Sequence, residues 1–266
     1  MEKKYELTEE TKEFYGRTLY RIKALKDFGD VEVGDLGGYI ESESNLIQEC
    51  CAWVYGNAMV YGDAKVYGDA KVFDNANVCG DAKVYGDAKV FDNANVCSDA
   101  KVFDNANVCG NAWVFGDAKV YGDAKVYGDA KVYGNAWVYG NAMVYGDAKV
   151  YGNAWVFGDA KVYGDAKVYG NANVCGDAEI KGKTDYIVFK NWWSSGRYFT
   201  WTHSNNMWKV GCFYGTGKEL VEKAYKDSEL SGREYERAVK YVESILADEK
   251  KQRKQLKSYM LKQKKK

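Results

Sequence analysis

The sequence predicts a mainly β protein whose central part is a narrow parallel β-helix, a solenoid of stacked coils. Three observations indicate this fold class. Valine or isoleucine occupies Val54 and every sixth position up to Ile180, 22 positions without an insertion or deletion. An alanine precedes each by two residues, from Ala52 to Ala178, and a Gly-Asp or Gly-Asn pair separates most units. A fixed short period of this kind is typical of solenoids.

Each unit divides into a short strand and a corner. In the extended phrase Ala-Lys-Val-Tyr, alternate side chains share a face, so we expect Ala and Val inside and Lys and Tyr outside. Gly and Asn tolerate the backbone angles of a corner. Where the glycine is missing, we expect the asparagine of each pair to adopt the positive φ. These pairs are Asp74-Asn75, Asp92-Asn93 and Asp104-Asn105.

Three units per turn are the expected arrangement. Four strand residues and two corner residues cannot return as a hairpin in register, and the small inward residues leave room for a thin core only. A triangular prism of three hexads per turn fits both constraints. At a strand spacing of roughly 4.8 Å, 22 hexads form just over seven coils and a rod of about 35 Å.

Residues 18 apart then stack into columns on the outer surface, where aromatic rings predominate. Three interpretations are open: the rings pack on one another, one face is buried in an oligomer, or the rings stack on sugars or bases. The columns are Tyr55, Phe73, Phe91, Cys109, Tyr127, Tyr145 and Tyr163; Tyr61, Cys79, Cys97, Phe115, Tyr133, Tyr151 and Tyr169; and Tyr67, Tyr85, Phe103, Tyr121, Tyr139, Phe157 and Cys175.

Composition and charge indicate a cytoplasmic protein. No run is long enough to span a membrane, and the N-terminus lacks the apolar segment of a secretory signal. The seven cysteines are expected to be free thiols, and no metal site is expected. The charge is +0 overall, but residues 184–266 carry 18 basic and 10 acidic groups, a net +8. That part has the electrostatic preference for anions.

The N-terminal residues 1–48 are expected to cap the rod. Leu7–Thr11 is predicted to start a helix with Thr8 as its N-cap. A strand is expected between residues 18 and 28, followed by a turn at Asp35–Gly38. Because Ile40 and Leu46 are six apart, we expect an irregular first coil here, with two extra residues before Val54.

This N-terminal region also carries a family resemblance. The phrases Ala24–Phe28 and Gly34–Glu43, leading into Ala52–Tyr55, resemble the opening of a hexapeptide-repeat family found in bacteria and their phages. The resemblance covers roughly residues 5–180, and its members are commonly labelled acyltransferases or acetyltransferases. It implies a single-stranded left-handed parallel β-helix, and the frequency of such genes in phages implies action in a host cytoplasm.

The regular period ends at residue 183, which closes the β-helix predicted for residues 49–183. Residues 184–247 are expected to form a small α+β domain that also caps the rod, with strands at 186–190, 197–202 and 207–214. Helices are expected at about 218–226 and after the capping-box spacing of Ser231–Glu234. The stripe of the second helix is Tyr235, Ala238, Val239, Val242, Ile245 and Leu246. Residues 248–266 are expected to form a basic tail, either a frayed helix or a disordered segment.

Catalysis has one weak candidate residue. Left-handed β-helix acyltransferases use a base histidine and bind a coenzyme A thioester between subunits of a trimer. The single histidine, His203, lies in a predicted turn outside the repeats. It is the available proton carrier if the chain is an enzyme, and otherwise an ordinary surface histidine.

A binding surface is predicted in the α+β domain, where aromatic and basic residues alternate. Such a pattern is typical of modules that hold nucleic acid or a phosphorylated molecule, although part of the set must form the domain core. The candidates are Lys190, Trp192, Trp193, Arg197, Tyr198, Phe199, Trp201, Trp208 and Lys209.

These patterns favour a non-catalytic binding or scaffold protein without a cofactor or membrane partner. Its expected partner is a host protein or a nucleic acid, engaged through the C-terminal domain and the aromatic columns, with interference with host defence as one role. The alternatives are a coenzyme A-dependent acyltransferase and a virion or self-assembling structural protein. A homo-oligomer, dimer or trimer, is compatible with each.

Overall fold

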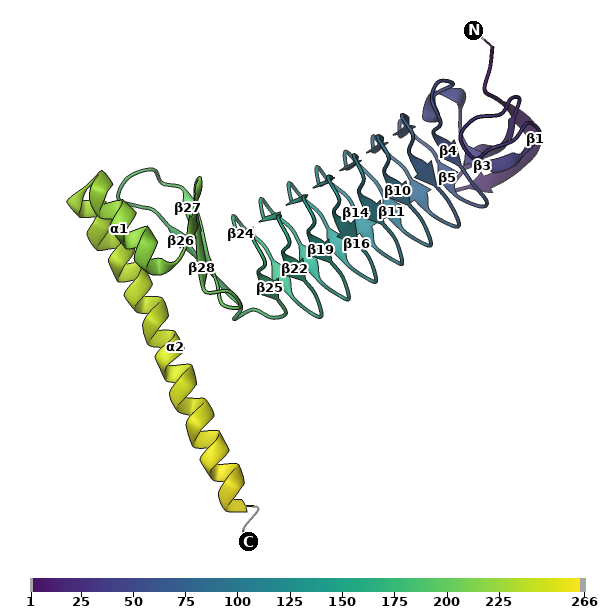
Figure 1. Ribbon diagram of the computed structural model, residues 1–266. Helices are drawn as coiled ribbons and strands as arrows, with labels where there is room; N and C mark the ends of the chain where they lie inside the picture. Colours follow the sequence, from purple (N-terminus) through teal and green to yellow (C-terminus); the bar gives the residue numbers. More distant parts are fainter. Residues whose placement is uncertain (1, 264–266) are drawn as a thin grey trace. The chain divides into compact units, whose positions relative to one another are not determined.

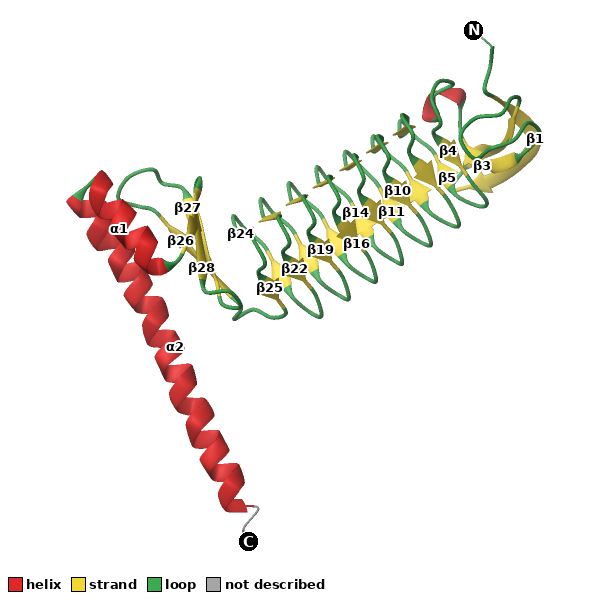
Figure 2. Cartoon of the chain, in the orientation of Figure 1, coloured by secondary structure: helices red, strands yellow, loops and turns green. Residues whose placement is uncertain are grey.

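The computed structural model describes residues 2–263 and shows a β-solenoid followed by a sheet and two helices (Figures 1 and 2). Two compact units divide the chain. The first contains the residues up to Ile187 together with Thr202–Asn205, and the second contains Val188–Trp201 and the residues from Asn206 onward. The predicted mainly β architecture, with a parallel solenoid and a small C-terminal domain, is confirmed.

Twenty-two short strands of the described chain form the rod, one for each hexad. They are β4 (Trp53–Val54), β5 (Met59–Val60), β6 (Lys65–Val66), β7 (Lys71–Val72), β8 (Asn77–Val78), β9 (Lys83–Val84), β10 (Lys89–Val90), β11 (Asn95–Val96), β12 (Lys101–Val102), β13 (Asn107–Val108), β14 (Trp113–Val114), β15 (Lys119–Val120), β16 (Lys125–Val126), β17 (Lys131–Val132), β18 (Trp137–Val138), β19 (Met143–Val144), β20 (Lys149–Val150), β21 (Trp155–Val156), β22 (Lys161–Val162), β23 (Lys167–Val168), β24 (Asn173–Val174) and β25 (Glu179–Ile180).

Every strand pairs in parallel with the strand three hexads away, as predicted. Val90, for example, lies between Val72 and Val108 in one sheet. The rod therefore has three parallel sheets, ordered β5-β8-β11-β14-β17-β20-β23, β4-β7-β10-β13-β16-β19-β22-β25 and β6-β9-β12-β15-β18-β21-β24. The repeat alanines and valines are buried almost completely. This core of small and β-branched side chains confirms the predicted inward face.

The corners depend on one residue with a positive φ per hexad. Glycine fills this place in most hexads, with φ near 68° at positions such as Gly86. Where glycine is missing, Asp74, Asp92 and Asp104 adopt the positive φ, so the prediction that the following asparagine does so is wrong. An aspartate fits here because its carboxylate accepts a backbone N–H from the corner one coil later; Gly110, for example, donates its N–H to the Asp92 carboxylate at 2.9 Å. Ser98, with φ 60°, is a corner that sequence reasoning missed.

The irregular first coil is present, and its two extra residues lie where predicted. Strand β3 (Leu36–Ile40) pairs with β5 so that Ile40 lies opposite Val60, and Leu46 forms a bridge with Val66. Both offsets are 20 residues instead of 18. A 3-10 helix, η1 (Glu43–Asn45), lies between Ile40 and Leu46, which keep the six-residue spacing. The two extra residues fall between Leu46 and Val54, which are eight residues apart. The buried Asn45 side chain donates to the carbonyls of Gly62 and Ala64 at 2.8 and 2.9 Å.

The N-terminal cap is a β-hairpin, so the predicted helix start at Leu7–Thr11 is wrong. Strand β1 (Tyr5–Phe14) pairs antiparallel with β2 (Arg17–Ala24), which pairs with β3. The turn residues Tyr15 and Gly16 both have positive φ, as a two-residue hairpin with the right twist requires. Pairing with β2 thus outweighs the weak helical preference of an acidic segment, and Thr8 caps no helix.

The predicted turn at Asp35–Gly38 is also wrong, because Leu36–Gly38 already belong to β3. Glycine occupies positions 37 and 38 of this strand because a side chain at Gly37 or Gly38 would not fit. A Cβ would lie 2.6 Å from the carbonyl oxygen of Val54 at Gly37 and 2.6 Å from that of Ala58 at Gly38. Glu41 follows, and its carboxylate accepts the Gly62 N–H at 2.7 Å and pairs with Arg17 at 2.8 Å. The Gly34–Glu43 segment, which carries part of the family resemblance, therefore joins the cap to the rod.

The second unit contains most of an antiparallel sheet and two helices. The sheet order is β26 (Tyr186–Lys190), β27 (Tyr198–Thr202), β28 (Met207–Val210) and β29 (Phe213–Gly215), the predicted third strand being split at Gly211. Helix α1 (Gly217–Asp227) begins at a Thr216–Glu219 capping box. Helix α2 begins at Glu229, two residues before the predicted Ser231, because Ser228 terminates α1.

Helix α2 (Glu229–Gln263) is 35 residues long and includes most of the predicted basic tail. The helical alternative is therefore confirmed for residues 248–263 and the disordered alternative is wrong there, because Glu, Lys, Gln, Arg, Leu and Met favour a helix and no breaker intervenes. Lys264–Lys266 lie outside the described residues. Neither helix within residues 2–263 combines the length and apolar character that crossing a bilayer requires.

Candidate functional site

A hairpin in the second unit contains five of the predicted binding residues, Trp193 and four that form its rim. Lys190 ends β26, Tyr198 begins β27, and Asn191 donates its N–H to the Arg197 carbonyl at 2.8 Å. Trp192 is 70% exposed and Tyr198 41% exposed. We call Lys190, Trp192, Arg197 and Tyr198 the hairpin rim. The rim lies on a loop whose ends are held by two adjacent strands.

Buried contacts hold the hairpin against α2. Asn191, itself buried, donates its side-chain amide to the Tyr235 hydroxyl at 3.0 Å and accepts the Ser194 N–H at 3.0 Å. The Trp193 ring packs edge-on against Tyr235 with centroids 4.9 Å apart. Trp193 Nε1 is buried without a hydrogen-bond partner, an arrangement that costs about 1–3 kcal/mol. The exposed rim is thus mounted on a fixed base.

The rim carries two cations that have no ion-pair partner within residues 2–263, Lys190 and Arg197. The Lys190 ammonium lies 6.0 Å from the Tyr198 ring centroid, at the edge of cation–π range. The surface therefore offers positive charge beside exposed rings. Such a surface suits a partner with carboxylates, phosphates or aromatic groups.

The other predicted candidates have different places. Phe199, Trp201 and Trp208 are buried and form the domain core, and Trp201 donates its indole N–H to Asn206 at 2.9 Å. Lys209 is half-buried on β28. His203 lies in the turn between β27 and β28, assigned to the first unit, where its backbone N–H donates to the Asp185 carbonyl at 2.8 Å. The set therefore divides into a core and a rim.

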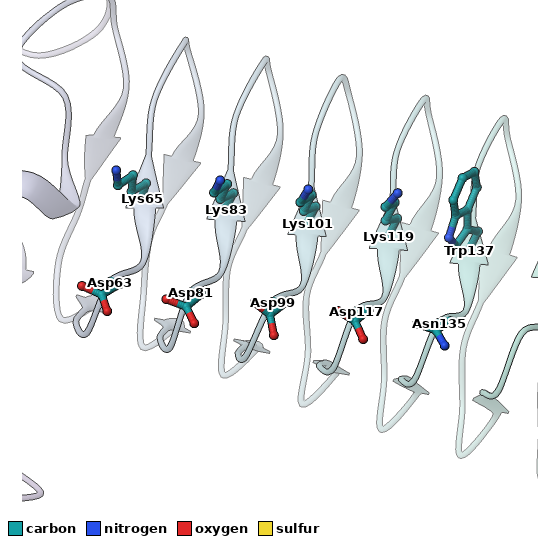
Figure 3. Close-up of a pocket in the computed structure, with 10 residues that line it drawn as sticks. All are labelled: Asp63, Lys65, Asp81, Lys83, Asp99, Lys101, Asp117, Lys119, Asn135 and Trp137. Carbon is teal, nitrogen blue, oxygen red and sulfur yellow. The ribbon is translucent and has the colours of Figure 1, made fainter.

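A long groove follows the rod surface over the sheet that contains β6, β9, β12 and β15 (Figure 3). An Asp lies at each corner and a Lys on each strand, repeated coil after coil until Asn135 and Trp137 take their places. The groove has a volume of about 920 Å³. We call it the charged groove; its charged residues are Asp63, Lys65, Asp81, Lys83, Asp99, Lys101, Asp117 and Lys119.

The Asp and Lys columns are coupled in the sequence, a signal that the repeat analysis missed. Each of the eleven repeat lysines from Lys65 to Lys167 follows an Asp by two residues. Where Trp, Met or Asn replaces the lysine after Trp53, the residue two before it is Asn, as in Asn135-Ala136-Trp137. The pairing keeps these hexads close to neutral. It offsets the repulsion between like charges stacked on successive coils.

Within the aromatic columns, the rings of successive coils pack on one another. Tyr85 stacks on Tyr67 and Phe103 with centroids 4.8 and 4.9 Å apart and planes within 3° of parallel. Lys119 lies 4.2 Å from the Trp137 centroid, and Trp155 stacks on that ring at 4.9 Å. Ring faces are therefore covered within the columns and ring edges point outward. Face-on stacking of a sugar or base is blocked inside an intact column.

Comparison with known proteins agrees with the solenoid. The family model described as YdcK Beta solenoid repeat matches residues 52–68 and 136–150. This chain is similar to that repeat family. Both matches fall in the rod, on β4 to β6 and on β18 to β20. No curated protein matches the chain.

Proposed function

We propose that the protein is a non-catalytic scaffold that binds a partner macromolecule through the hairpin rim. The observation that carries the proposal is the 70% exposed Trp192 on the same hairpin as Arg197 and Tyr198, with the hairpin fixed to α2. Trp, Tyr and Arg are the residue types enriched at binding hot spots. Preorganisation of the loop supports the same view, because little entropy is lost when an already ordered side chain is bound.

The rod supports a scaffold role in a different way. Its hexads repeat one neutral surface at equal spacing, which suits support and display more than the precise placement of a single reacting group. The stacked columns serve this role by stiffening the rod. The resemblance of the Gly34–Glu43 phrase to bacterial and phage proteins motivates a host protein as the partner, with interference with host defence as the proposed consequence.

A pull-down from host lysate with matched baits tests the proposal. The baits are the full chain, a chain ending at residue 249, Trp192→Ala, and Trp113→Ala. Trp113 is a control because it is 45% exposed on the rod. We expect one stoichiometric protein, resistant to nuclease, on the full, shortened and Trp113→Ala baits. Loss of a hot-spot residue costs 2 kcal/mol or more, so Trp192→Ala should retain less than about a tenth.

Three outcomes would contradict this proposal. Equal capture by Trp192→Ala would place the interface elsewhere. Capture that disappears with nuclease would make the partner a nucleic acid. Capture that is lost in the chain ending at residue 249, which lacks the basic residues 250–266, would attribute binding to nonspecific charge attraction.

A further inference from the structure

Two cysteines lie next to each other where the second aromatic column is interrupted. Strands β8 and β11 pair with Val78 opposite Val96, and Cys79 donates its backbone N–H to the Val96 carbonyl at 2.9 Å. Cys79 and Cys97 therefore occupy equivalent positions on successive coils. Their side chains therefore project from adjacent strands on the same outer face of the rod. Neighbouring strands place Cα atoms roughly 4.8 Å apart, within the range that a disulfide spans.

The other two repeat cysteines provide an internal contrast. Cys109 lies between Phe91 and Tyr127 in its column, and Cys175 follows Phe157. Neither has another cysteine next to it in its column. All four repeat thiols are at least half-buried and share the local sequence Asn-Val-Cys. What distinguishes Cys79 and Cys97 is their adjacency.

The two thiols also differ in acidity. The neighbouring Cys97 thiol, the Tyr61 hydroxyl and the positive charge of Arg17 in the cap lower the pKa of Cys79 to about 7 despite burial. The contact with Cys79 and burial raise the pKa of Cys97. Burial likewise raises the pKa of Cys109. One sulfur is thus a nucleophile at neutral pH beside a second thiol in reach.

We propose that Cys79 and Cys97 form a reversible disulfide between two coils in response to a peroxide. The Cys79 thiolate attacks one oxygen of hydrogen peroxide, the O–O bond breaks, and hydroxide leaves and is protonated to water. The Cys97 sulfur then attacks the sulfenic acid, the S–O bond breaks, and a second water leaves. The two thiols lose two electrons and two protons to the peroxide, which is reduced to two waters.

The bond would tie together two coils of the rod near the N-terminal cap. In the reduced protein, the parallel pairing of β8 with β11, with Val78 opposite Val96, holds these two coils together. A covalent bond would further oppose their separation. The oxidised rod is expected to unfold at a higher temperature than the reduced rod. This inference is independent of the proposed partner and of the hairpin rim.

Peptide mapping of the full chain tests the inference. The chain is treated with hydrogen peroxide, its remaining thiols are alkylated, and trypsin then separates Cys79 (residues 72–83), Cys97 (90–101) and Cys109 (102–119). We expect a linked pair of the first two peptides, formed at least about tenfold faster than any modification of Cys109 and reversed by dithiothreitol. Linkage no faster than Cys109 oxidation, or linkage between chains only, would overturn the proposal.

Single substitutions separate the roles of the two sulfurs. In Cys97→Ser, Cys79 should accumulate as a sulfenic acid that dimedone traps. In Cys79→Ser, Cys97 should react about as slowly as Cys109. Cys109→Ser is the matched control and should form the bond at the normal rate. A Cys97→Ser chain whose Cys79 resists peroxide would contradict the mechanism, provided that circular dichroism shows the chain folded.

Discussion

At the scale of single residues, each corner of the rod requires one residue with a positive φ. Glycine adopts this backbone without strain, whereas an L side chain costs roughly 1–2 kcal/mol. The three aspartates recover part of that cost by accepting a backbone N–H from the next coil. Ser98 makes no side-chain bond of that kind within the described chain, so it is the weakest corner.

Replacing that serine should therefore stabilise the protein. We expect Ser98→Gly to raise the free energy of unfolding by about 0.5–1 kcal/mol. The substitution relieves the backbone strain at positive φ, and the greater entropy of glycine in the unfolded chain offsets part of that gain. Gly128→Ala is the reverse test, since its Cβ would lie 3.0 Å from the Gly146 nitrogen at φ 71°. It should lower the free energy by about 1–2 kcal/mol. Denaturant titration measures both, and a destabilised Ser98→Gly would refute this account of the corners.

Glu41 gives the junction between cap and rod a dependence on acid. The Gly62 N–H and the Arg17 guanidinium hold the pKa of Glu41 below its ordinary 4.5. Its stabilising contribution is present in full above pH 4.5, and it is lost as pH falls from there through the lower folded value. Glu41→Gln should therefore lose less unfolding free energy than the natural chain between about pH 4.5 and pH 3. Parallel curves would show that the carboxylate contributes nothing.

At the scale of elements, a stacked column is a chain of equivalent ring contacts. Tyr85→Ala removes two of them, and at about 0.5–1.5 kcal/mol each the unfolding free energy should fall by about 1–3 kcal/mol. Tyr85→Phe keeps both rings and should change it by less than about 0.5 kcal/mol. Thermal or denaturant unfolding measures the difference. Equal losses in the two variants would assign the effect to the hydroxyl and not to stacking.

Elements with a strong local period were predictable and elements fixed by distant contacts were not. The rod strands, the inward Ala and Val and the stripe of α2 follow from spacing alone. The N-terminal hairpin was missed because Tyr15-Gly16 was not recognised as its turn. Gly37 and Gly38 were assigned to a turn because their close approach to Val54 and Ala58 is visible only in three dimensions.

The residue types of the candidate site were predictable from the sequence. Which of these residues are buried and which are exposed was not. The sequence pattern identifies the aromatic and basic residues of the C-terminal domain, but alternation along a short strand does not tell which side the helices cover. In the structure Phe199 and Trp201 of β27 are buried, whereas Trp192 on the loop is exposed. Only the packing of Tyr235 against Trp193 reveals that the loop is fixed.

At the scale of the whole molecule, the stability of the rod is expected to be the sum of contributions from similar coils and from the contacts between neighbouring coils. Deleting residues 117–134 removes one complete coil and joins equivalent hexads, so the chain should still unfold cooperatively and keep its remaining stability. Deleting residues 117–131 breaks the hexad and turns later valines out of phase, and that chain should not fold. Circular dichroism with a melting curve distinguishes the two. Unfolding of both would contradict the independence of the coils.

Hydrogen exchange can show whether a bound partner covers the hairpin rim while the rod serves only as its support. Backbone exchange is compared between the full chain alone and the chain saturated with the captured partner. We expect slower exchange at residues 190–198 and unchanged exchange over the charged groove, residues 63–119, because the partner binds the rim. Slower exchange along the groove with no change at 190–198 would contradict this expectation.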